Sequence, residues 1–194
     1  MALVDMSRTG FIQRLVITGV VGLALLQAPP AAAQQSTVDF TVSGTSTIRG
    51  WTCEVSGTSQ VTQGSSAPAP GFATGVQTAT LTVPVSAFEC PNEEMTGHLL
   101  EALKPDEFSE ITFELEGYEA SGQQTEATGA LTIMGVTQPV SFPVALTPSG
   151  AGVEIEGDVR LDMTTYGVEP PVVMLGLMSV RPQIRIEFKG LITP

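Results

Sequence analysis

Residue types that commonly carry enzyme chemistry are scarce in this chain of 194 residues. Its single histidine, His98, has no cysteine or carboxylate arranged with it as a nucleophile–base pair requires. The sequence also contains no nucleophile elbow and no glycine-rich phosphate loop before a helix. An imidazole suits proton transfer, but a lone histidine more often packs or lies on the surface. We therefore expect no catalytic residue, no cofactor and no enzymatic activity.

Four carboxylates lie on one side of a predicted strand and could suggest a calcium site: Glu154, Glu156, Asp158 and Asp162. Successive side chains on one face of a strand are about 7 Å apart. The four groups therefore extend along the strand and cannot converge on one ion. The sequence predicts no metal site here.

The N-terminus has the order of a secretory signal peptide. Two arginines precede an apolar run at residues 15–26, and three alanines at 31–33 form a small-residue cleavage site. The run is short for a membrane span, and a proline pair follows it, which argues against the alternative of a membrane anchor. We expect a signal peptide at residues 1–33 and a periplasmic or secreted domain at 34–194, without an integral membrane span.

The only two cysteines, Cys53 and Cys90, lie in the part of the chain that we expect to be exported. Disulfides persist in exported proteins, so we expect these two to pair. A reactive thiol or a metal-binding pair is the alternative, but no histidine or further cysteine lies at ligand spacing from them. The sequence favours a disulfide that stabilises the domain.

The expected mature chain is strongly acidic. From residue 34 onward it contains 6 basic and 19 acidic side chains, a formal net charge of −13. Such a charge repels nucleic acid and anionic lipid headgroups, so we expect neither nucleic-acid partners nor electrostatic membrane docking. The acidic surface is explained by solubility or by a high-salt habitat.

Apolar and polar residues alternate through eight segments, the pattern of half-buried strands. The segments are residues 38–42, 51–55, 79–85, 111–115, 131–133, 140–146, 153–163 and 184–188. A single apolar face on so many strands predicts an all-β fold, an eight-stranded antiparallel barrel without exposed edges. One short helix, from Asn92 to Lys104, carries an apolar stripe and is expected to cap one end.

The central segments resemble a known family. LLEALKPDEFSEITFEL at residues 99–115 and TGALTIMGVTQPV at 128–140 are similar to the YceI-like family, with weaker likeness in STIRGWTCEV and TTYGVEPP. This resemblance implies an exported, lipocalin-like barrel, and some members bind polyisoprenoid or other long-chain lipids. It also suggests a periplasmic or secreted variant with a disulfide.

An eight-stranded barrel is filled by side chains or holds one slim ligand. We expect an apolar long-chain lipid or isoprenoid as the partner, and a ligand-free interaction module of the cell envelope as the alternative. Gly129 and Gly157 are expected to remove volume and leave a channel. The predicted lining comprises Phe40, Trp51, Leu81, Val83, Phe113, Leu131, Ile133, Phe142, Ile155, Gly157, Leu161 and Ile186.

Two loops differ in composition. Residues 62–77 are rich in glycine, serine, alanine and proline, and we expect a flexible surface excursion there. Residues 166–180 are unusually apolar, and they are expected either to plug the barrel end or to form a portal for an apolar ligand. The residues concerned are Val172, Val173, Met174, Leu175, Leu177 and Met178.

Overall fold

The computed structural model describes residues 35–65, 67–121, 124–150 and 152–193. The predicted signal peptide at residues 1–33 lies outside these ranges. All structural statements below concern the described residues.

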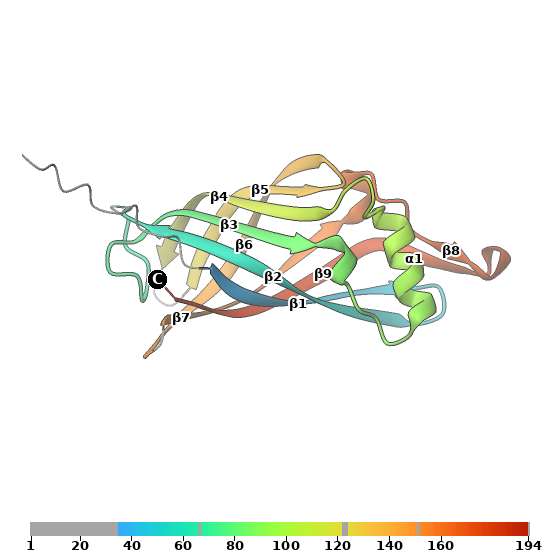
Figure 1. The fold of residues 1–194 in the computed structure, drawn as a ribbon, viewed down its shortest axis with the longest axis horizontal. Helices are drawn as coiled ribbons and strands as arrows, with labels where there is room; N and C mark the ends of the chain where they lie inside the picture. Colours follow the sequence, from blue (N-terminus) through green and yellow to red (C-terminus); the bar gives the residue numbers. More distant parts are fainter. Residues whose placement is uncertain (1–34, 66, 122–123, 151, 194) are drawn as a thin grey trace, which may run out of the picture. The chain divides into compact units, whose positions relative to one another are not determined.

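Eight long strands form an antiparallel barrel in the described part of the chain (Figure 1). Each strand pairs with the next along the chain, and β1 also pairs with β9, which closes the barrel. A further strand, β8 (Val172–Val173), pairs only with the start of β9. This confirms the predicted fold. The barrel strands are β1 (Gln35–Ser46), β2 (Gly50–Gln63), β3 (Val76–Pro84), β4 (Glu110–Ser121), β5 (Gln124–Ile133), β6 (Val136–Ser149), β7 (Gly152–Asp162) and β9 (Met178–Ile192).

Alternation in the sequence explains which side chains enter the barrel. In β1, Val38, Phe40 and Val42 are buried while the residues between them are exposed or half-buried. Side chains point to opposite faces at successive positions of a strand, so one apolar set lines the interior. The core gathers residues of this kind from every barrel strand.

Pairing between two pairs of strands is incomplete. β2 pairs with β3 only from Thr58 onward, and β6 pairs with β7 only from Val144 onward. Other segments contact the unpaired halves. Glu54 of β2 exchanges two backbone hydrogen bonds with Glu89, of 2.7 and 2.8 Å. The Gln138 side chain of β6 donates to the Thr165 carbonyl, at 3.4 Å. The strands therefore separate toward one end of the barrel, which we call the helix end.

The disulfide forms beside the first of these contacts. Cys53 in β2 is bonded to Cys90, 37 positions later, next to the Glu54–Glu89 bridge. This confirms the predicted pairing. Closing a loop of this length limits the unfolded chain, an effect worth at most about 4 kcal/mol in the chain-entropy model. The bond also attaches the segment before the helix to the barrel wall.

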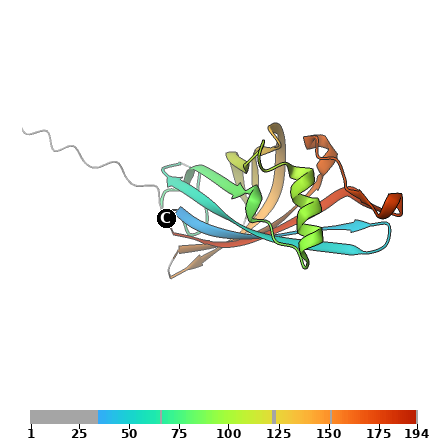
Figure 2. The ribbon, with the colours of Figure 1, turned by 45° about the vertical axis from the view of Figure 1, so that its right-hand side comes forward.

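The helix, α1 (Glu93–Leu103), has the predicted ends. The Asn92 side chain accepts a hydrogen bond from the Met95 amide at 2.9 Å, and Glu93 and Glu94 favour the positive end of the helix dipole. Lys104, before Pro105, ends the helix in a left-handed conformation with φ 51°. Figure 2 shows α1 at the helix end, and no residue of α1 is fully buried.

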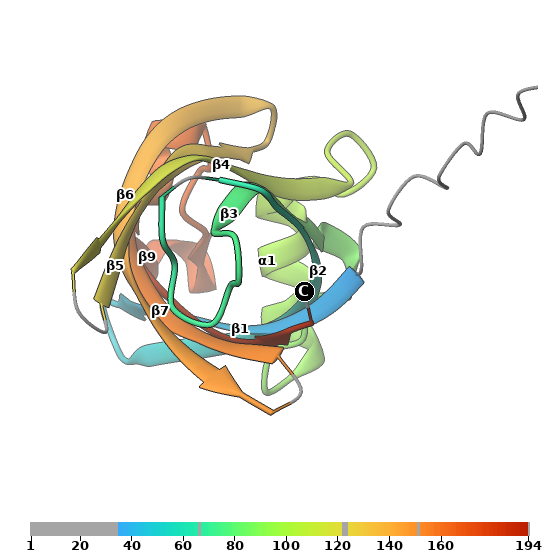
Figure 3. The ribbon, with the colours of Figure 1, turned by 90° about the vertical axis from the view of Figure 1, so that its left-hand side faces the viewer.

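The opposite end, which we call the loop end, is closed by the segment predicted to be a flexible excursion. The described residues between β2 and β3, 64–65 and 67–75, cross this end of the barrel (Figure 3). Ala69 and Phe72 are buried in the core, and the Tyr118 hydroxyl donates to the Ala67 carbonyl at 2.6 Å. The prediction of a surface excursion is wrong, because a buried phenyl ring anchors the segment.

The expected channel at the two glycines is also absent from the described structure. A Cβ on Gly157 would lie 2.6 Å from the Phe188 ring and 2.6 Å from the Pro143 carbonyl oxygen. A Cβ on Gly129 would lie 2.6 Å from the Phe113 ring. Each glycine therefore makes room for a cross-strand aromatic ring. The removed volume is occupied by phenylalanine and is not open space.

Candidate ligand-binding cavities

A first cavity, of about 210 Å³, lies inside the barrel toward the loop end. Of the 30 residues that line it, only Ser59, Thr80, Tyr118 and Thr125 have polar side chains, and none is charged. Phe72 closes it from the loop between β2 and β3. This cavity offers burial to an apolar chain and almost no hydrogen bonding.

A second and larger cavity, of about 570 Å³, lies at the helix end. Drug-sized ligands occupy pockets of about 300–1,000 Å³. The apolar stripe of α1 forms one wall, through Met95, Leu99, Ala102 and Leu103. These four side chains are half-buried: they pack against the edge of the core and also border this hollow space. The helix covers this cavity in the way that the sequence predicted for a cap.

The second cavity reaches the protein surface, and its charged groups lie there. Exposed Ile48, Arg49, Asn92 and Glu94 are part of its lining, together with half-buried His98. Deeper in, the lining is apolar and includes Ile133, Met163 and Ile184. We call Ile48, Arg49, Asn92, Glu94 and His98 the mouth of this cavity. An amphipathic molecule would match this order, with its polar group at the mouth and its chain inside.

A layer of five apolar side chains borders both cavities: Val42, Phe88, Ile111, Leu131 and Ile186. The two spaces are therefore neighbours, separated by the thickness of these side chains.

Two buried polar atoms next to the cavities have no hydrogen-bond partner among the described residues. They are the indole Nε1 of Trp51, at the second cavity, and the hydroxyl of Thr125, at the first. An unsatisfied buried polar group costs free energy. The Trp51 ring lies over Gly44, where a Cβ would be 2.5 Å from it. This packing positions the indole in the cavity wall.

Comparison with known proteins identifies the family. The sequence profile of the YceI-like domain matches residues 31–190. The chain belongs to the YceI-like family. A search of curated proteins gives no match.

Several solved structures have the same fold at low sequence identity. BcnA of Burkholderia cenocepacia is 20% identical with a TM-score of 0.60, covering 79% of this chain and 96% of its own. A polyisoprenoid binding domain from Saccharophagus degradans is 11% identical with a TM-score of 0.58, covering 81% and 97%. A Campylobacter jejuni YceI protein is 12% identical with a TM-score of 0.54, covering 92% and 96%.

Most of the predicted lining borders a cavity in this YceI-like barrel. Phe40, Leu81, Val83, Phe113, Leu131, Phe142, Ile155 and Ile186 line the first cavity, and Trp51 and Ile133 line the second. Gly157 and Leu161 line neither: Phe188 covers Gly157, and Leu161 packs in the cluster around Met163 and Tyr166. Sequence reasoning missed the contributions of Phe72 and of the mouth residues. The apolar stripe of α1 was a signal for the second cavity, whereas nothing marked Phe72.

The apolar segment at residues 166–180 is divided between two roles. Tyr166 and Val168 are buried, while Val172, Leu175 and Leu177 are exposed and so do not plug the barrel. Met178 is half-buried and lines the second cavity. Val173 and Met174 have described backbones only. The plug interpretation is therefore wrong for the exposed residues, and the portal interpretation stays a hypothesis.

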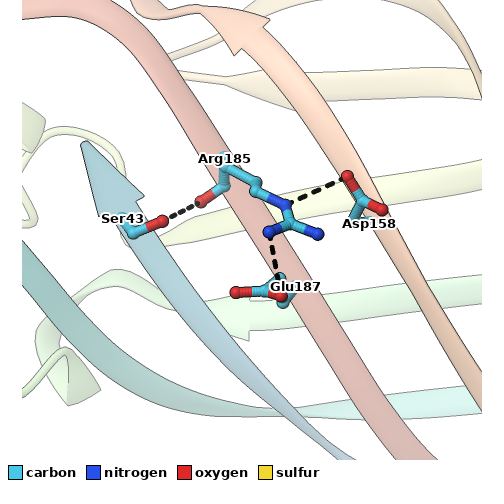
Figure 4. Close-up of polar contacts among 4 residues, drawn as sticks. All are labelled: Ser43, Asp158, Arg185 and Glu187. Carbon is cyan, nitrogen blue, oxygen red and sulfur yellow. Dashed lines mark hydrogen bonds and ion pairs between the residues drawn. The ribbon is translucent and has the colours of Figure 1, made fainter.

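Charged groups of the YceI-like barrel form contacts on its outer face. Arg185 in β9 donates through Nε to Asp158 in β7 at 3.1 Å, and its Nη1 lies 3.3 Å from Glu187 (Figure 4). The hydrogen bond from Arg185 lowers the pKa of Asp158, and the same bond raises the pKa of Arg185. None of these three residues lines the first cavity, whose lining is uncharged.

Within the described part of the chain, no helix is long and apolar enough to cross a membrane.

Proposed function

We propose that this YceI-like protein binds one long-chain apolar lipid, a polyisoprenoid or an acyl chain, inside the barrel. The observation that carries the proposal is the pair of neighbouring, largely apolar cavities with charged groups only at the mouth of the larger one. Each methylene moved from water into such a lining contributes about 0.8 kcal/mol, so affinity grows with chain length. The name of the Saccharophagus degradans relative, a polyisoprenoid binding domain, supports this ligand class.

In the proposed complex the chain lies between the barrel walls and its polar group stays at the mouth. Arg49, Asn92 and His98 offer donors to an anionic or hydroxyl group there, while Glu94 offers an acceptor. The role proposed for these residues is binding, and the proposal includes no chemical step.

Trp51 supplies the test, because it is the only tryptophan of the chain and borders the second cavity. We expect delipidated protein, titrated with a polyprenol or a fatty acid in detergent, to show a saturable change in Trp51 emission at one ligand per protein. Native mass spectrometry of undelipidated protein should show one bound lipid. A short-chain alcohol of the same type is the control and should bind far more weakly.

The contrary result is a protein that carries no extractable lipid and whose Trp51 emission does not respond to any chain. The barrel would then be a ligand-free interaction module of the cell envelope, and the cavities would be packing defects.

We also propose that the protein acts in the periplasm or outside the cell. The support is the order of basic, apolar and small residues at positions 1–33, together with a disulfide in the folded domain. N-terminal sequencing of the mature protein should begin at Gln34. A mature form that starts at Met1 would contradict this location.

A further inference from the structure

Two neighbouring hairpin tips project at the helix end with exposed apolar side chains. The first tip is the β1–β2 turn, residues 46–50, and the second is the β8–β9 hairpin, residues 170–181. Figures 1 and 2 both show the two turns extending beyond α1 at this end. Ile48 is 62% exposed in the first tip, and Val172, Leu175 and Leu177 are 62%, 106% and 75% exposed in the second.

Hydrogen bonds hold the two tips together as one surface. The Thr47 amide donates to the Ser179 carbonyl at 3.0 Å, and the Thr47 hydroxyl donates to the Leu177 carbonyl at 3.3 Å. The Ser179 amide in turn donates to the Thr47 hydroxyl at 3.3 Å. The apolar side chains therefore share one platform and are not independent loop residues.

The fold alone does not account for the leucines of the second tip. Leu175 has φ 57°, a left-handed conformation that glycine or asparagine adopts more readily, and its side chain is fully exposed. Exposed apolar groups in an unfavourable backbone conformation are typical of a surface that meets a partner. Leu175 and Leu177 do not line either cavity.

Charge distinguishes the tips from the rest of the molecule. Their 17 residues include Arg49 and Arg181 and no carboxylate, whereas the remainder of the chain from Gln34 has 4 basic and 19 acidic residues. Both arginines are exposed, and neither forms an ion pair with a described residue. The net charge of the whole chain argues against docking of the barrel wall, whereas the charged side chains of the tips themselves are the two arginines. The tips complement a surface that is apolar inside and anionic outside.

We propose that the two hairpin tips insert into the interfacial layer of a lipid bilayer and bring the mouth of the second cavity to the membrane. Ile48, Pro171, Met178 and Val180 belong to the tips and also line that cavity, so the inserted surface is continuous with the mouth. The choice of a lipid surface over a protein partner rests on the proposed function, because a long apolar chain resides in membranes and not in water. The insertion is shallow and does not span the bilayer.

The test uses the full mature protein and unilamellar vesicles of phosphatidylethanolamine with a minority of phosphatidylglycerol. We expect wild-type protein to float with the vesicles, and the double variant Leu175→Ser/Leu177→Ser to partition at least tenfold less. Leu191→Ser is the matched control, since Leu191 is 38% exposed near the loop end of β9, and it should partition like wild type. Replacing phosphatidylglycerol by phosphatidylcholine should weaken vesicle binding. The double variant Arg49→Gln/Arg181→Gln should lose less affinity than wild type in this exchange.

Lipid uptake from detergent separates this proposal from the proposed function. The Leu175→Ser/Leu177→Ser variant should bind a polyprenol from detergent like wild type, because neither residue lines a cavity. The docking proposal would be overturned if wild-type protein does not float with the vesicles, even if lipid uptake from detergent succeeds. Equal partition of wild type and double variant would overturn it too. Light scattering that shows a dimer of the wild-type protein, and a monomer of the double variant, would also overturn the proposal. The tips would then join two copies of the chain.

Discussion

Gly157→Leu is expected to destabilise the barrel by about 3 kcal/mol or more, at the upper end of the usual cost of overpacking. The Cβ alone would lie 2.6 Å from both the Phe188 ring and the Pro143 carbonyl oxygen. A ring can turn aside, but the Pro143 oxygen belongs to the paired backbone of β6 and cannot. Denaturant unfolding followed by circular dichroism measures the change in the free energy of unfolding.

Gly97→Leu is the matched control for this substitution. Gly97 lies on the exposed side of α1, and a Cβ there would meet no atom within 4 Å. Leucine has a higher helix propensity than glycine by up to about 1 kcal/mol, so this variant should be as stable as wild type or slightly more stable. Equal unfolding midpoints for Gly157→Leu and wild type would contradict the packing described for Phe188.

Ala102→Phe is expected to weaken binding of a long-chain lipid about fifteenfold or more. The new ring would project from α1 into the second cavity, where Ala102 lies in the wall. Displacing two methylenes of the ligand removes about 1.6 kcal/mol of apolar burial, which corresponds to that factor in Kd. The dissociation constant is measured by titration of Trp51 emission, which a phenylalanine does not obscure.

Glu101→Phe provides the comparison on the same helix. The Glu101 side chain is 86% exposed and lines neither cavity, so a ring there leaves the cavity unchanged. Its Kd should equal that of wild type. The proposed site would be refuted if Ala102→Phe, folded and as stable as Glu101→Phe, bound the lipid with wild-type affinity.

The strands were predictable because burial on one face imposes a strict alternation, as Val38, Phe40 and Val42 show. The ends of α1 were predictable because Asn92 and Pro105 have local conformational effects. Alternation tells which side chains face inward but not how they share the interior. It therefore placed Gly157 correctly on the inner face and could not show that Phe188 covers it.

The composition of the two loops, residues 62–77 and 166–180, was a poor basis for predicting their structure, for related reasons. Phe72 is one ring among small and polar residues, and its burial depends on contacts with strands distant in sequence. Conversely, the apolar run around Leu175 predicted either burial or a portal, and only the folded chain shows that a turn holds this side chain in solvent. Both outcomes depend on tertiary contacts that no local pattern contains.

The pairing of β1 with β9 has a consequence for the order of folding. Each other strand of the barrel pairs with a neighbour along the chain, but Val38 meets Gly190 across almost the whole domain. A chain that emerges from a ribosome or a translocation channel, N-terminus first, would hold β1 with one free edge until its last strand arrives. Contacts of such large sequence separation slow folding, and free strand edges promote association between chains. The kinetic risk of this barrel is therefore concentrated in β1 and β7, the two strands that wait for β9.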